Sequence, residues 1–212
     1  MGIIFGLFVA FTAAQVWNDS QQATATVDRE ASALRAVVIL ASSFPGEPDA
    51  RLRNLIREYI AEAAAKEWPM MAHRTANIRT TPQAPVEALS FALTLAPNSE
   101  GQKIAQRDIT SSLENALDAR RQRILISASE VNLVKWSALI LQAVCALIAI
   151  AMVHSDNRLA AVIALVVFAA GVATSVLLIV SHDRPFIGQV AVGPEPLLQV
   201  MPQAEAAHPQ AN

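Results

Sequence analysis

The sequence has few of the residues that build disulfides, metal sites or nucleic-acid surfaces. Among 212 residues there is one cysteine, Cys145, so an intramolecular disulfide is excluded and a thiolate-metal site lacks ligands. Aromatic residues make up only 5%, too few for platforms that stack on bases. The formal net charge is −2, so no basic excess points to nucleic acid. We expect no nucleic-acid partner, and we interpret Cys145 as a small buried hydrophobic residue.

Catalytic sequence patterns are missing as well. The chain contains no Gly-x-Ser-x-Gly, no phosphate-binding glycine loop and no HExxH. The four histidines stand alone, without the i, i+4 pair that holds a metal on a helix. Residues 28–30 with Arg35 could form a catalytic cluster, but ion pairs between helices explain such residues more simply. We therefore predict no enzyme activity, no cofactor and no metal site.

Two long apolar runs near the C-terminus are what the sequence does contain. They cover residues 134–153 and 159–181, with a polar break at 154–158. Each holds about 20 residues, which as a helix rise about 30 Å, the thickness of the hydrocarbon core of a bilayer. Gln142 is the only strongly polar side chain between residues 137 and 153. Because a backbone in lipid must satisfy its own hydrogen bonds, residues 133–181 are predicted to form a transmembrane helical hairpin.

Residues 2–16 form a third apolar run of about 15 residues, which is short for a span. Two interpretations are open. A cleaved signal peptide would place Thr12 and Ala14 before the cut, but no basic residue precedes Ile3. Helical spacing also continues beyond that cut, because residues 15–43 contain neither glycine nor proline. We therefore predict one long helix within residues 1–43, which leaves the membrane near Trp17 and continues into the cytoplasm.

Residues 44–132 have the pattern of a helical domain. A breaker cluster at 44–48 precedes an amphipathic helix over 48–67, which Pro69 should end. A short helix is predicted over 85–95. Ser99 and Gln102 form a capping-box pair that opens a further helix, ending at Ile126. The tail, residues 182–212, is broken by prolines, and we expect an extended chain that is disordered beyond about residue 201.

The fold class that follows is an all-α integral membrane protein. Three transmembrane helices are expected, with a helical cytoplasmic domain inserted between the first helix and the C-terminal hairpin. Residues 18–132 carry 13 of the 16 lysines and arginines, while the hairpin loop carries only Arg158. Positive residues stay on the cytoplasmic side. We therefore place residues 18–132 and the C-terminus in the cytoplasm and residues 154–158 outside.

Five cations lie close to the predicted membrane ends: Arg120, Arg121, Arg123, Lys135 and Arg184. They could bind anionic lipid headgroups. They could equally complement a helix C-terminus and set the topology, and this second interpretation is the simpler one.

A stripe on the first helix gives the most specific functional hypothesis. Five residues follow a three-four spacing and share one face: Phe5, Phe8, Thr12, Gln15 and Asp19. The stripe changes from aromatic to polar as the helix leaves the membrane. Around a central axis it would form a hydrophobic constriction that opens into a polar vestibule. The alternative is that the aromatic residues face lipid and the polar residues face water.

Several short stretches together resemble the bestrophin-like family of uncharacterised bacterial membrane proteins. The matching residues are 17–19 (WND), 28–34 (DREASAL), 67–69 (EWP), 117–121 (LDARR) with Arg123, and 183–188 (DRPFIG) continuing into Val192, 194–196 (PEP) and Leu197. Any one stretch is weak, but their order covers nearly the whole chain. Family members usually carry a further membrane helix before this one, so the chain begins inside what would be the second span. We expect either that the gene encodes a longer protein or that this is a shortened, three-span member of the family.

The resemblance implies a cytoplasmic helical domain and an oligomer like that of bestrophin anion channels. We therefore expect a homo-oligomeric, ion-conducting pore in the bacterial inner membrane, with membrane lipid as its surroundings. The alternative is a membrane-anchored interaction or scaffold module that binds a cytoplasmic protein and transports nothing.

Cysteine labelling from outside the cell tests the predicted topology. In a Cys145→Ser background, a Ser155→Cys variant should react with an impermeant maleimide, because residues 154–158 are expected outside. A Ser99→Cys variant should react only after the membrane is permeabilised. The reverse labelling pattern would contradict the assignment.

Overall fold

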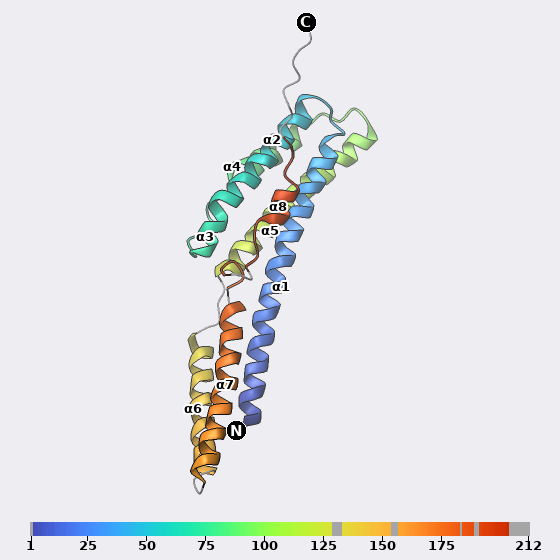
Figure 1. The fold of residues 1–212 in the computed structure, drawn as a ribbon. Helices are drawn as coiled ribbons and strands as arrows, with labels where there is room; N and C mark the ends of the chain where they lie inside the picture. Colours follow the sequence, from blue (N-terminus) through green and yellow to red (C-terminus); the bar gives the residue numbers. More distant parts are fainter. Residues whose placement is uncertain (1, 129–132, 154–156, 183, 189–190, 204–212) are drawn as a thin grey trace. The chain divides into compact units, whose positions relative to one another are not determined.

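The computed structural model of the chain describes residues 2–128, 133–153, 157–182, 184–188 and 191–203 (Figure 1). Helices account for all the regular secondary structure within these ranges, which confirms the predicted all-α class. Contacts divide the chain into two compact units. We call residues 1–22 and 129–191 the hairpin unit, and residues 23–128 and 192–212 the polar unit.

This division differs from the predicted domain boundaries. The long helix α1, Gly2–Ala41, belongs to both units, with the boundary after Gln22. Its second half packs inside the polar unit, where Ala23, Val27 and Leu34 are fully buried. Residues 23–41 are therefore a core element of the polar unit.

The hairpin unit consists of the start of α1 with α6, Leu133–Val153, and α7, Arg158–His182. Its core is small and apolar, formed by Phe5, Val16, Leu139, Ala143 and Ile179. Three helical stretches are long and apolar enough to cross a membrane: Ile3–Ala41, Trp136–Val153 and Arg158–Ser181. The prediction of three candidate spans is confirmed by length and composition.

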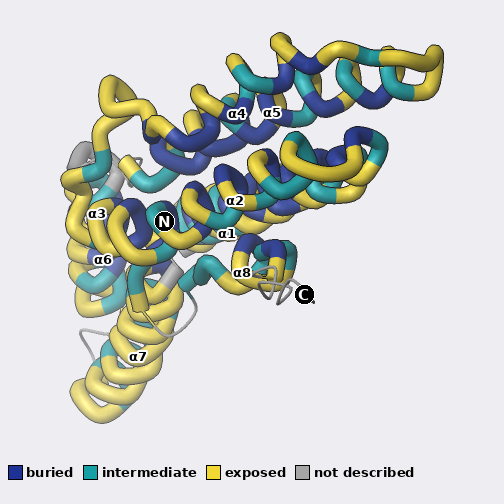
Figure 2. Tube along the Cα trace, turned by 90° about the horizontal axis from the view of Figure 1, so that it is seen from above, coloured by how far each residue is buried: buried dark blue, intermediate teal, exposed yellow. Residues whose placement is uncertain are grey.

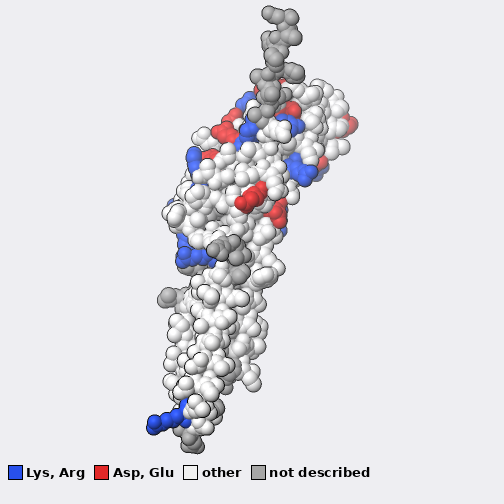
Figure 3. Space-filling model, in the orientation of Figure 1, with Lys and Arg blue, Asp and Glu red and all other residues white. Residues whose placement is uncertain are grey.

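The outer faces of the hairpin are apolar, as contact with lipid requires. Met152, Leu159 and Leu177 are each at least 70% exposed, and the visible surface of α6 and α7 carries almost no charge (Figure 3). A helix that is hydrophobic all round is typical of a membrane span. Cys145 lies exposed on α6, so the expectation that it is buried was wrong.

The polar unit is built from amphipathic helices that bury one face each (Figure 2). They are α2, Glu47–Glu62; the π-helical turn η1, Ala63–Glu67; α3, Trp68–Ala72; α4, Gln83–Thr94; α5, Glu100–Ala128; and α8, Glu195–Gln199. On α2 the predicted apolar stripe is buried, namely Leu52, Leu55, Ile56, Tyr59 and Ile60. Gly46 has φ 93°, which only glycine adopts easily, and it allows the sharp change of direction before α2.

Pro69 does not end the helix, contrary to the sequence-based prediction. The chain passes from α2 through η1 into α3, where Pro69 occupies one of the first helical positions. Proline is tolerated there because it directly follows the π turn, where the regular α-helical hydrogen-bond pattern is already interrupted. The chain leaves the helix only after Ala72.

The predicted capping box at the start of α5 is present. The Gln102 amide N–H donates to Ser99 Oγ over 3.2 Å, and Gln102 Oε1 accepts from the Asn98 N–H over 2.7 Å. In the usual capping box the side chain would accept from the backbone N–H of the N-cap residue, Ser99; here it accepts from the N–H of the residue before it.

The tail contains a short helix that was not predicted. Pro194 is the N-cap of α8 and Pro196 is its second residue, where a missing N–H costs nothing. Leu197 on α8 is fully buried. On either side of α8, Trp68 Nε1 donates to the Val192 carbonyl over 3.0 Å and Arg57 Nε donates to the Pro202 carbonyl over 3.0 Å. Residues 192–203 are thus part of the polar unit.

Leu197→Ala should destabilise the polar unit by about 2–5 kcal/mol, because it removes a buried side chain and leaves a cavity. The matched control is Leu198→Ala on the same helix, where the side chain is 44% exposed and the loss should stay below about 1 kcal/mol. Thermal unfolding followed by helical circular dichroism in mild detergent measures both. Equal losses would show that the tail does not pack as described.

Candidate functional site

The predicted pore-lining face of α1 turns partly toward the hairpin. Phe5 is buried in the core of the hairpin unit, with its ring 5.5 Å from that of Phe168 on α7. Thr12 is also buried, and its hydroxyl donates to the Phe8 carbonyl over 2.9 Å. Phe8 is half-buried against the same core. Phe5 and Thr12 therefore face the inside of the chain, contrary to the expectation that they line a pore.

Gln15 and Asp19, the polar end of the predicted stripe, are less covered. Gln15 is exposed and Asp19 is partly exposed. At 100° per residue, Gln15 lies about 60° around the helix from Thr12, toward the exposed side of α1.

A different face of α1 is exposed throughout the hairpin unit. It carries Ile4, Leu7 and Phe11, each more than half exposed, followed by the exposed residues Gln15, Asn18 and Gln22. From Ile4 to Gln22 the spacing averages about 3.6 residues, the period of the α-helix. This face runs from apolar to polar along the helix.

The cations expected near membrane ends fall into two groups. Arg121 and Arg184 are exposed, and the side chain of Lys135 lies outside the described residues. Arg120 and Arg123 are buried, so they are unavailable to lipid headgroups, and that interpretation of these two was wrong.

Arg123 is the centre of an ion-pair network inside the polar unit. Its side chain is 0% exposed, as is that of Glu30 on α1. Arg123 Nε donates to Glu30 Oε2 over 2.8 Å, and Nη2 donates to Glu30 Oε1 over 3.1 Å and to Glu67 Oε2 over 2.9 Å. The guanidinium carbon lies 4.2 Å from the ring centre of Trp68. Carboxylates from α1 and η1 and an aromatic ring from α3 therefore converge on one cation.

The partners of Arg123 are themselves held. The Tyr59 hydroxyl donates to Glu30 Oε1. Arg120 Nε donates to Glu67 Oε1 over 2.7 Å, and Arg120 Nη2 donates to the Thr80 carbonyl over 2.8 Å. Two arginines and two glutamates balance, so the cluster has no net formal charge. Such pairing is the condition for burying ionised groups.

The environment keeps the donors of the network protonated. Burial, with the neighbouring charge of Glu30, raises the pKa of the Tyr59 hydroxyl well above its ordinary value. For Arg123, burial by itself would lower the guanidinium pKa, but the charges of Glu30 and Glu67 raise it above its ordinary value. Tyr59 and Arg123 therefore stay protonated near neutral pH.

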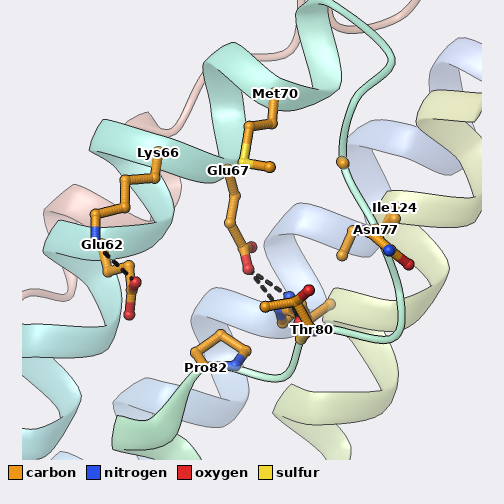
Figure 4. Close-up of a pocket in the computed structure, with 10 residues that line it drawn as sticks. Glu62, Lys66, Glu67, Met70, Asn77, Thr80, Pro82 and Ile124 are labelled. Carbon is orange, nitrogen blue, oxygen red and sulfur yellow. Dashed lines mark hydrogen bonds and ion pairs between the residues drawn. The ribbon is translucent and has the colours of Figure 1, made fainter.

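A small pocket of ≈ 170 Å³ borders the Arg120–Glu67 pair (Figure 4). Lys66 pairs with Glu62 across 3.1 Å at its rim, while Met70 and Pro82 add apolar walls. Its charged groups already pair with each other, and small-molecule sites are usually about 300–1,000 Å³. Among the described residues, no group of three or more His, Cys, Asp or Glu could hold a metal ion. We assign no cofactor or substrate to this pocket.

The sequence contained a signal for this network that pattern analysis did not use. Glu30 lies within the apolar stripe of α1, between Val27 and Leu34. Arg120 and Arg123 likewise continue the buried positions of α5 after Leu113 and Ala116. A charged residue at a core position must find a buried counterion. Opposite charges in two such stripes predict that the helices meet there.

Glu30→Gln should destabilise the polar unit by about 3–5 kcal/mol, because it leaves the buried Arg123 charge short of a counterion. The matched control is Glu87→Gln, which breaks the exposed Arg51–Glu87 pair at 3.0 Å and should cost less than about 1 kcal/mol. Thermal unfolding in mild detergent compares the two. A small effect of Glu30→Gln would show that the network does not hold the helices together.

Comparison with known proteins agrees with the architecture. A family model for the Bestrophin-like domain matches residues 1–197, which include the five stretches that carry the resemblance. No curated protein and no solved structure matches the chain. The match extends from the first candidate span through the polar unit and the hairpin to Leu197 on α8. The chain therefore belongs to the Bestrophin-like family.

Proposed function

We propose that this protein forms a homo-oligomeric, ion-conducting pore in the bacterial inner membrane, with the polar unit on the cytoplasmic side. Membership of the Bestrophin-like family supports a channel-like membrane protein. Three helices with suitable length and composition support a multi-pass chain. The orientation follows from the excess of lysine and arginine in residues 18–132.

The exposed face of α1 carries the proposal. Ile4, Leu7 and Phe11 are 60%, 56% and 68% exposed, although they belong to an apolar helix beside an apolar hairpin. Amide side chains then continue the same face at Gln15, Asn18 and Gln22. The described surfaces of α6 and α7 are mainly apolar, and the exposed hydroxyls of Thr174 and Ser175 on α7 bond back to carbonyls of their own helix.

Arranged around a central axis, this face acts as a gate. Copies of Phe11 and Leu7 would surround a narrow apolar segment, from which water withdraws and in which an ion loses its hydration. The amide groups beyond it can replace part of that hydration, because each offers both a donor and an acceptor. Phe5 and Phe8 lie on another side of α1 and pack against the core of the hairpin unit.

A second function is favoured by exposed apolar residues on the polar unit. Val86 and Leu93 on α4 are 44% and 65% exposed and lie seven residues apart, hence on one face. A cytoplasmic protein partner could cover them. In that case α1, α6 and α7 serve as an anchor, and Phe11 contacts lipid.

Ion flux from liposomes separates the two functions. Phe11→Ala should raise the flux per oligomer, because removing the ring widens and wets the constriction. Phe5→Ala is the matched control, since that ring is buried within one chain against Phe168. It should impair folding or assembly without raising flux.

The contrary results are equally specific. A rise with Phe5→Ala but not with Phe11→Ala would show that the other face of α1 lines the pore. Well-reconstituted oligomers of the wild type and both variants that pass no ions would contradict the pore and favour the anchored interaction module.

A further inference from the structure

Two exposed stripes in the polar unit have no function in the fold. On α1 the stripe consists of Ala25, Asp28, Ser32, Arg35 and Ile39, and on α5 it consists of Ile104, Arg107, Ser111, Glu114, Asp118, Arg121 and Leu125. Every member is exposed, and both stripes follow an alternating three-four spacing. Each stripe lies opposite the buried positions of its own helix, so within one chain both point away from the shared core.

The helices α1 and α5 run antiparallel. The polar contacts between them show which residues lie at the same level along the helix axes, which we call the same height. At one end, Arg29 Nη1 donates to Gln122 Oε1 over 3.4 Å and Arg123 binds Glu30. At the other end, Gln102 Nε2 donates to the Ser43 carbonyl over 2.8 Å. Interpolation between the two ends places Arg35 at the height of Glu114. Asp28 lies just beyond the first of these contacts, and its height differs from that of Arg121 by about two to four residues, or 3–6 Å.

The charges at equal or neighbouring heights are opposite. Asp28 matches Arg121, Arg35 matches Glu114, and Ser32 lies at the height of Asp118, which its hydroxyl can donate to. Among the described residues, no hydrogen bond or ion pair joins Asp28, Arg35, Glu114 or Arg121 to another side chain. Among the described residues, each stripe therefore carries two charged side chains that are not paired within the chain. Their order along α1 is complementary to their order along α5.

We propose that the α1 stripe of one copy packs against the α5 stripe of the next copy, with Asp28 facing Arg121 and Arg35 facing Glu114 of that copy. A rotation axis that runs along the helices brings equal heights together, so Arg35 meets Glu114 directly and the long side chain of Arg121 spans the offset to Asp28. The contact is head-to-tail, because it joins two different surfaces, and it closes into a ring when the rotation from copy to copy completes a full turn. This inference rests on the proposed oligomer and specifies the surface that builds it.

The contact also explains the composition of the stripes. Ala25 and Ser32 are small, so two helix backbones can approach closely there. Ile39 and Leu125 are 59% and 49% exposed, and each would be covered near the ends of the contact. Charged pairs fix the register and select the partner more than they add affinity.

Disulfide trapping between two differently tagged chains tests the register. Both chains carry Cys145→Ser; one has Arg35→Cys and the other Glu114→Cys. After purification on both tags and mild oxidation, a cross-linked dimer of the two chains is expected. The matched control replaces Glu114→Cys by Arg121→Cys, about 10 Å further along α5. That pair should remain monomeric on a denaturing gel, because a disulfide needs Cα atoms within about 7 Å.

Charge reversal provides a second, independent measurement. Asp28→Arg alone and Arg121→Asp alone should each raise the dissociation constant of the oligomer about fivefold, because an attractive pair becomes a repulsive one. The double variant should return to within about twofold of the wild type. Light scattering across a detergent dilution series measures the fraction assembled.

Failure of the interface and failure of the pore give different results. Efficient trapping of the Arg121→Cys control, or single variants no weaker than the double variant, would overturn the proposed contact. Ion flux from oligomers that fail the trapping test would overturn the contact and leave the pore intact. Correct trapping in oligomers that pass no ions supports the contact and contradicts the pore.

Discussion

The polar unit depends on one buried cation. Arg123 has no contact with solvent, and an unpaired guanidinium in that position would cost several kcal/mol. Its counterions come from α1 and from η1, and an aromatic face comes from α3. None of these elements is adjacent to α5 in the sequence. The helices must therefore come together in one arrangement for the charge to be satisfied, so the network specifies how they pack more than it adds stability.

The π-helical turn follows from the same requirement. Tyr59, Ala63, Glu67 and Met71 are all buried at a spacing of four residues. In a regular α-helix such a row rotates by about 40° at each step, so its last members would leave the core. The wider π turn at Ala63–Glu67 offsets this rotation. Glu67, Trp68 and Met71 therefore all reach Arg123.

The hairpin unit differs from the polar unit in how its helices are held together. Its apolar side chains are mostly exposed, and its core is limited to a few contacts between α1, α6 and α7. In lipid there is no gain from hiding apolar surface, so helices associate through close packing and a few polar contacts. Gln142 Oε1 is buried in this unit without a hydrogen-bond partner among the described residues. An unsatisfied polar group inside a membrane costs free energy.

The sequence alone determined the class of the protein and most of its helices. Long apolar runs, the absence of glycine and proline from residues 15–43, and the Ser99–Gln102 pair are local signals, so α1, α5, α6 and α7 could be predicted. The family resemblance could also be recognised from short stretches of sequence.

The sequence did not determine which face of each helix is buried. A three-four spacing shows which residues share one side of a helix but not what that side faces, and only packing against Phe168 decided that Phe5 faces inward. Likewise, the cations at Arg120 and Arg123 looked like surface residues because their counterions lie 53 to 93 residues away in the chain. Tertiary structure alone decided these roles, because burial of a charge depends on partners that no local pattern contains.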